Sequence, residues 1–137
     1  MADPIPLAMI QAAIAALEDS RTKMQAFLQQ NPGSSLYAQV DNLDTQASKA
    51  IAALNGQALN VIGGQAAEAL EELREVADAS KLFIQNINDI KNGLKVIASF
   101  LVLIGAVMMR DPSGIISGAK GVKDAIDNAN AAAVGNP

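Results

Sequence analysis

Residues 96–109 read VIASFLVLIGAVMM, and this stretch decides how the chain can fold. It contains no charged residue, and Ser99 is its only hydroxyl. A helix on the surface of a small domain needs a polar stripe that faces water, and this stretch has none. It must therefore be covered on all sides by the rest of the chain, by other copies of the chain, by a partner or by lipid. We expect the protein to work through helix association.

The composition favours an all-α fold. A chain of 137 residues, half of them hydrophobic, is expected to form one domain with a modest core. Only four residues are aromatic, so Ala, Leu, Ile and Val supply the apolar volume, as is typical of helix bundles. The chain has no cysteine, which excludes a disulfide framework.

Three amphipathic helices are predicted before the apolar stretch, over residues 5–30, 35–62 and 65–92. In each of them apolar residues recur at alternating steps of three and four, which is the heptad spacing of coiled coils. Pro4 and Pro6 are expected to open the first helix, where a missing amide hydrogen costs little. Asn31-Pro32-Gly33 is expected to end it.

Two helix boundaries are less clearly marked. The second helix can end at Asn55-Gly56 or at Gly63-Gly64, and the sequence leaves both open. The spacing of the third helix continues into the apolar stretch, and an unbroken helix over 65–109 would be roughly 65 Å long. A compact domain of this size is only about 35–40 Å across. We therefore expect a break or strong bend at Asn92-Gly93, because glycine weakens a helix interior.

The C-terminal part is predicted to be a helical hairpin. Asp111-Pro112-Ser113-Gly114 has the composition of a turn, and a Gly- and Ala-rich helix is expected over 115–134. The predicted fold is therefore all-α: an antiparallel bundle of three long amphipathic helices in 1–92 and an apolar helical hairpin in 93–137, together one domain.

Small residues in the hairpin predict close helix packing. They are spaced so that two helix backbones can approach each other, as occurs at helix contacts in membranes and in Ala-rich hairpins of water-soluble proteins. These residues are Ala98, Gly105, Ala106, Gly114, Gly118 and Gly121. In the simpler interpretation, 115–134 only covers 94–109. One Gly/Ala helix and a narrow bundle face do not easily surround a helix that is apolar all round, so we expect part of it to stay available.

Residues of the hairpin are the candidate contacts with lipid or with other copies of the chain. The apolar candidates are Val96, Ile97, Phe100, Leu101, Val102, Leu103, Ile104, Val107, Met108, Met109, Ile115 and Ile116. Basic residues flank the stretch at Lys91, Lys95 and Arg110, where they could approach an anionic lipid surface.

Charge and residue types exclude several classes of function. The net charge is −4, with −5 in residues 1–92 and +1 in residues 93–137. An acidic body of this kind argues against binding to nucleic acid. Without His or Cys the chain has neither a Ser-His or Cys-His nucleophile pair nor an ordinary zinc site. It also has no phosphate-binding loop motif. We therefore expect no enzymatic activity, cofactor, metal or small-molecule substrate.

Two further charged features receive structural interpretations. The acidic residues Glu68, Glu71, Glu72, Glu75 and Asp78 are interpreted as a solvated helix face rather than a metal site, because Arg74 lies among them. Arg21 interrupts the first apolar stripe. Its head group is expected to reach Glu18, Asp19 or an acid on the next helix.

In layout, residues 94–122 and the helices before them resemble α-helical pore-forming toxins. In that class, long amphipathic helices carry a short apolar hairpin that enters a membrane after oligomerisation. The resemblance implies a self-associating, membrane-active protein. The alternatives are a soluble assembly subunit (filament, ring or secretion-machine component) with the apolar helix buried between copies, and a small module that binds a partner helix. The first residues do not form a Sec signal peptide, so we expect a cytoplasmic protein or one exported by another route, able to associate with membranes.

Overall fold

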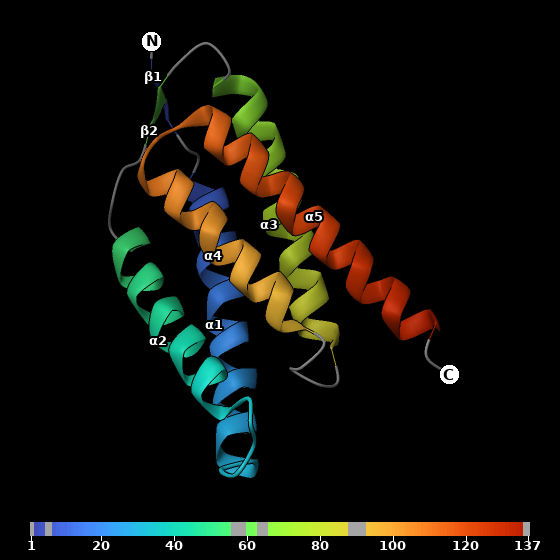
Figure 1. Cartoon of the computed structure of the whole chain (residues 1–137). Helices are drawn as coiled ribbons and strands as arrows, with labels where there is room; N and C mark the ends of the chain where they lie inside the picture. The colour runs from blue at the N-terminus through green and yellow to red at the C-terminus, as the bar shows by residue number, and fades with distance from the viewer. Residues whose placement is uncertain (1, 5–6, 56–59, 63–65, 88–92, 136–137) are drawn as a thin grey trace.

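The computed structural model describes residues 2–4, 7–55, 60–62, 66–87 and 93–135. Within these residues the chain forms a bundle of five helices, so the predicted all-α class is confirmed (Figure 1). The helices are α1 (Leu7–Gln30), α2 (Tyr37–Leu54), α3 (Ala66–Asn86), α4 (Leu94–Met108) and α5 (Pro112–Gly135). Two short strands, β1 (Ala2–Pro4) and β2 (Asn60–Ile62), pair antiparallel with Ala2 opposite Ile62.

Each helix packs against two others. α1 packs against both α2 and α3, and α5 packs against both α3 and α4. α4 lies between α2 and α5, and it runs antiparallel to α5 (Figure 1). The apolar helix is thus flanked by α2 and α5, and its buried residues join the common core.

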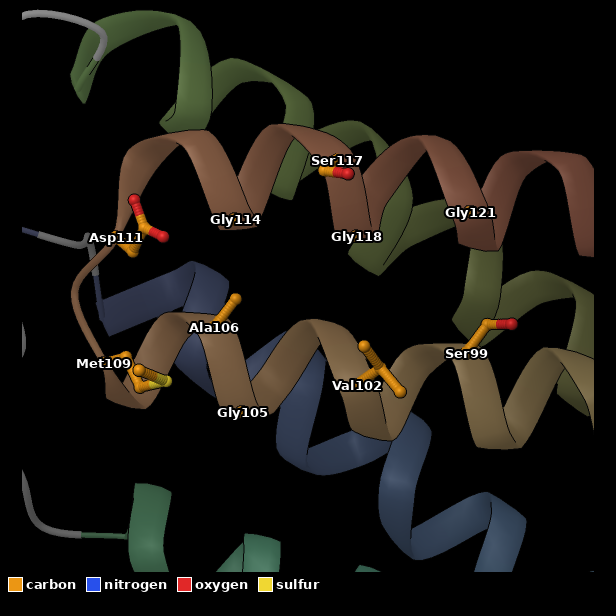
Figure 2. A pocket seen from close by; sticks show the side chains of 10 residues that line it. All are labelled: Ser99, Val102, Gly105, Ala106, Met109, Asp111, Gly114, Ser117, Gly118 and Gly121. Carbon is orange, nitrogen blue, oxygen red and sulfur yellow. The ribbon is translucent and has the colours of Figure 1, made fainter.

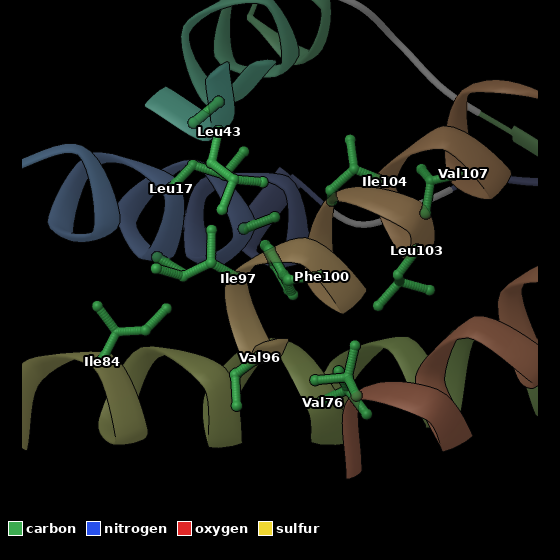
Figure 3. Close-up of a cluster of buried hydrophobic side chains, with 14 of the residues drawn as sticks. Leu17, Leu43, Val76, Ile84, Val96, Ile97, Phe100, Leu103, Ile104 and Val107 are labelled. Carbon is green, nitrogen blue, oxygen red and sulfur yellow. The ribbon is translucent and has the colours of Figure 1, made fainter. Parts of the chain in front are cut away.

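The apolar stripes of the predicted helices form one continuous core. Phe100 of α4 is 1% exposed and lies near its centre, with Leu17 of α1, Leu43 of α2 and Val76 of α3 around it (Figure 3). Fully burying one large apolar side chain contributes about 1.5–3 kcal/mol, so the stripes supply the main stabilising term.

The helix ends near the two uncertain boundaries are now defined. α2 ends at Leu54, so the Asn55-Gly56 end is right and a helix reaching residue 62 is wrong. α3 ends at Asn86 and α4 begins at Leu94, so residues 65–109 do not form one rod. Lys23 donates from Nζ to the carbonyl oxygen of Ile87 at 2.8 Å, which places a cation at the C-terminal end of α3, where the helix dipole favours it.

The α4–α5 turn is shorter than expected and lies earlier in the chain. α4 ends in a Schellman motif, in which the Asp111 amide donates to Ala106 and the Arg110 amide donates to Val107. Arg110 has a φ of 59° and occupies the left-handed position that glycine usually fills. Pro112 is already the first residue of α5, a position that suits proline, so the prediction of a turn over 111–114 and a helix from 115 is wrong.

The first residues also differ from the prediction. Pro4 closes β1 instead of opening α1, which begins at Leu7. Pro6, Gly63, Gly64, Lys91 and Asn92 lie outside the described residues.

Candidate functional site

The apolar stretch is mostly buried by the chain itself. Of the twelve predicted contact residues, seven are buried: Val96, Ile97, Phe100, Leu103, Ile104, Val107 and Ile115. Leu101, Met108 and Ile116 are half-buried. In the single chain these residues pack against neighbouring helices, so their contact with lipid or with another copy would require the bundle to open, and it stays a prediction.

Coverage of α4 is more complete than the sequence suggested, because α2 also packs on it. The sequence predicts cover of α4 by the following helix and by one narrow face of the bundle. In the structure α4 lies between α2 and α5, with α1 and α3 residues completing the core around Phe100 (Figure 3).

One stripe of α4 remains open to solvent. Val102 and Met109 keep 69% and 79% of their surface exposed, and Gly105 between them is exposed as well. Together with α5 this stripe bounds a groove of about 560 Å³ (Figure 2). It is lined by Ser99, Val102, Gly105, Ala106, Met109, Asp111, Gly114, Ser117, Gly118 and Gly121.

The hairpin glycines fall into two groups. At Gly118 an added Cβ would lie 3.2 Å from the Cα of Leu103, and at Gly114 it would lie 3.3 Å from the Cβ of Ala106. These two glycines therefore let α5 approach α4 closely. At Gly105 and Gly121 an added Cβ would meet nothing within 4 Å, so both open onto the groove. Ala98 is half-buried against the core.

Charges lie at the two ends of the groove rather than along it. Lys95 is exposed one turn before Ser99 on the same face of α4. Asp111 lines the opposite end. Arg110 is exposed beside it in the turn but does not line the groove. Lys95 is therefore the charge at one end of a mainly apolar surface, and Asp111 stands at the other end with Arg110 beside it.

The hairpin is tied to α3 by ion pairs. Lys123 of α5 donates from Nζ to Glu72 Oε2 at 2.6 Å and to Glu75 Oε2 at 3.0 Å. These two hydrogen bonds raise the pKa of the Lys123 ammonium above its ordinary value. Glu71 pairs with Arg74 at 3.0 Å on the exposed side of α3. Glu68, Glu71, Glu75 and Asp78 are exposed, as expected of a solvated face, and Glu72 is half-buried. Glu72 and Glu75 in addition pair with α5 through Lys123.

The first and second helices are joined by a similar pair. Arg21 Nε donates to Asp44 Oδ1 of α2 at 2.9 Å, so of the three alternatives expected for Arg21 the structure shows the acid on the next helix. The side chain of Asp44 is only 13% exposed and that of Arg21 is 33% exposed. This pair positions α1 against α2 and has no place in the groove.

The described part of the chain has neither of two features that indicate function directly, a metal site and a membrane-spanning helix. Among those residues, no group of three or more acidic, His or Cys side chains is arranged to hold a metal ion. No described helix combines the length and hydrophobicity that are needed to cross a bilayer. No protein-family model, curated protein or solved structure matches the chain.

Proposed function

We propose that this is a non-enzymatic, self-associating helical protein that uses the hairpin around residues 94–122 to enter or lie in a lipid bilayer once copies assemble. The observation that carries the proposal is the placement of α4. Its apolar run, uncharged from Val96 to Met109, is buried or half-buried by the rest of the chain except along the stripe of Val102, Gly105 and Met109. Such an arrangement keeps a lipid-compatible segment covered in water, as in α-helical pore-forming proteins.

The hairpin is proposed to act as a unit that separates from a bundle of α1, α2 and α3. α4 and α5 are joined by a three-residue turn, and Gly118 packs directly on the backbone at Leu103. Small-residue contacts of this kind stay favourable in lipid, because they depend on close packing rather than on the exclusion of water. Exposed Lys95 and Arg110 at the two ends of α4 favour anionic head groups.

Vesicle leakage tests this function. Dye-loaded vesicles of anionic lipid should release dye when the protein is added, and zwitterionic vesicles should release less. If neither kind of vesicle binds the protein or leaks, the membrane function is excluded.

A locked variant tests whether the hairpin must move. The chain has no cysteine, so Glu72→Cys and Lys123→Cys can be joined by a reducible bismaleimide linker at the site of the native ion pair. This link ties α5 to α3. Leakage should be lost in the linked protein and return on reduction.

The matched control carries Glu71→Cys and Arg74→Cys, which also replace an ion pair but lie on α3 alone. The same linker should leave its leakage unchanged. Leakage by the locked Glu72/Lys123 variant equal to that of this control would show that the hairpin does not need to leave α3.

A soluble assembly subunit is the second candidate. It is favoured by Val102 and Met109, which are largely exposed although they belong to the apolar stretch. In this function copies of the chain would cover the stripe without lipid. Light scattering without detergent should then show a defined oligomer, and a monomer at all concentrations would exclude it.

A further inference from the structure

Two of the large hydrophobic side chains that stay exposed in the described part of the chain share one face. Among the described residues four large hydrophobic side chains are exposed: Tyr37, Leu82, Val102 and Met109. Tyr37 and Leu82 lie on different helices, whereas Val102 and Met109 both line the α4–α5 groove (Figure 2). The groove thus brings two exposed apolar side chains onto one surface.

The shape of this face is complementary to itself. Val102 projects from α4, and Gly105, one turn later, leaves open space where a side chain would stand. If a second α4 lies antiparallel on the first, each Val102 comes opposite the Gly105 of the other copy. A two-fold dimer requires this reciprocity: Val102 of the first copy contacts Gly105 of the second, and Val102 of the second contacts Gly105 of the first.

The charges disfavour a parallel arrangement. Lys95 and Asp111 stand at opposite ends of the groove. In an antiparallel pair the Lys95 of each copy meets the Asp111 of the other. In a parallel pair the two Lys95 ammonium groups would lie side by side, which costs free energy.

We propose that the α4–α5 groove is the surface through which two copies of this chain associate, with the α4 helices antiparallel and centred between Val102 and Gly105. The proposal gives a site and a geometry to the self-association that belongs to the proposed function, and it rests on that function. It requires no opening of the bundle, because every residue involved already lines the groove or stands at its ends.

Sedimentation of the full chain over a concentration series tests the surface. The wild type should show a monomer–dimer equilibrium, and Val102→Glu should weaken it roughly tenfold or more, because a carboxylate would be buried against an apolar partner. Leu82→Glu is the matched control, since Leu82 is 61% exposed and lies on α3 outside the groove. It should dimerise like the wild type, and circular dichroism should show that both variants are folded.

Cysteine crosslinking tests the direction of the helices. Ser99 and Met109 lie near the two ends of the groove, about 15 Å apart along α4. A mixture of Ser99→Cys and Met109→Cys proteins should form mixed disulfide dimers under mild oxidation, and Ser99→Cys alone should form few. The reverse result would establish a parallel pair and overturn the proposed geometry.

Failure of this inference can be told apart from failure of the proposed function. A wild type that stays monomeric in water, or a dimer that Val102→Glu does not weaken, overturns the groove as the self-association surface. If the same preparation still causes vesicles to leak, the membrane function stands without it. A Val102-dependent dimer that leaves vesicles intact supports the groove and excludes the membrane function.

Discussion

Gly118 of α5 lies directly against the backbone of Leu103 of α4: a Cβ on the glycine would stand 3.2 Å from the leucine Cα. A larger side chain at this position has to push the two helices apart. We expect Gly118→Leu to lower the free energy of unfolding by roughly 1–3 kcal/mol, the usual cost of overpacking. Urea unfolding followed by circular dichroism measures this change.

Gly121, one turn later on α5, provides the comparison. An added Cβ there meets nothing within 4 Å, so Gly121→Ala adds helix propensity without a clash. This variant should gain about 0.5–1 kcal/mol. If Gly118→Leu and Gly121→Ala shift stability in the same direction, α4 and α5 do not pack as closely as described.

Two buried serines differ in whether the hydroxyl has a partner. Ser20 Oγ donates to the Ala16 carbonyl oxygen at 2.8 Å, whereas Ser80 Oγ has no hydrogen-bond partner among the described residues. Both replacements by alanine gain helix propensity, but only Ser20→Ala loses a hydrogen bond. We therefore expect Ser80→Ala to be more stable than Ser20→Ala by about 0.5–1.5 kcal/mol. Equal stabilities in thermal melts would mean that the Ser80 hydroxyl is satisfied in solution.

The stability of the α4–α5 turn depends on one residue in an unfavourable conformation. Arg110 has a φ of 59°, which costs an L-residue about 1 kcal/mol and glycine almost nothing. Arg110→Gly should therefore raise the melting temperature, and Arg110→Ala, which keeps the strain, should not. A lower melting temperature for Arg110→Gly than for Arg110→Ala would contradict the left-handed assignment.

Most of the fold could be predicted from apolar spacing. Val40, Leu43 and Ala47 follow the predicted stripe of α2, and all three are buried. Spacing predicts which face of a helix is buried, but it does not report contacts between distant segments. For this reason the pairing of β1 with β2, which joins residues about sixty positions apart, was not foreseen. The Schellman turn was missed because Arg110 occupies the position at which a glycine would have signalled it.

The candidate site could be predicted only in part. Lack of charge identified residues 96–109 as a segment that needs cover, and the glycine spacing indicated a close contact with the following helix. Which stripe stays exposed depends on how α2 and α5 are placed around α4, and this follows from packing of the whole core. Val102 and Val107 are the same residue type in the same helix, yet Val102 is 69% exposed and Val107 is 3% exposed.

Breaking the ion pair between α1 and α2 should destabilise the fold, mainly because Asp44 would be left without its partner. The Asp44 side chain is only 13% exposed, so Arg21→Met leaves a largely buried carboxylate without its partner. We expect this variant to lose about 1–2 kcal/mol of stability, and the double variant Arg21→Met with Asp44→Leu to recover part of the loss. A double variant less stable than Arg21→Met would show that the pair is not the reason for the loss.

The contact between Lys123 and two glutamates should depend on pH at the alkaline end. The pKa of the Lys123 ammonium is raised in the folded state by the hydrogen bonds to Glu72 and Glu75, so the protonated form stabilises the fold. This stabilisation is present below the ordinary value of 10.5 and is lost as the pH rises through the higher folded pKa. Because the pair is partly exposed, Lys123→Gln should lower the free energy of unfolding by only about 0.2–1 kcal/mol at pH 7. Lys120→Gln, at an exposed position of the same helix, is the control and should lower it less. Urea unfolding at pH 7 and above pH 10.5 should show that the difference in stability between the two variants shrinks at the higher pH. A difference that persists there would assign the effect to packing of the lysine stem rather than to its charge.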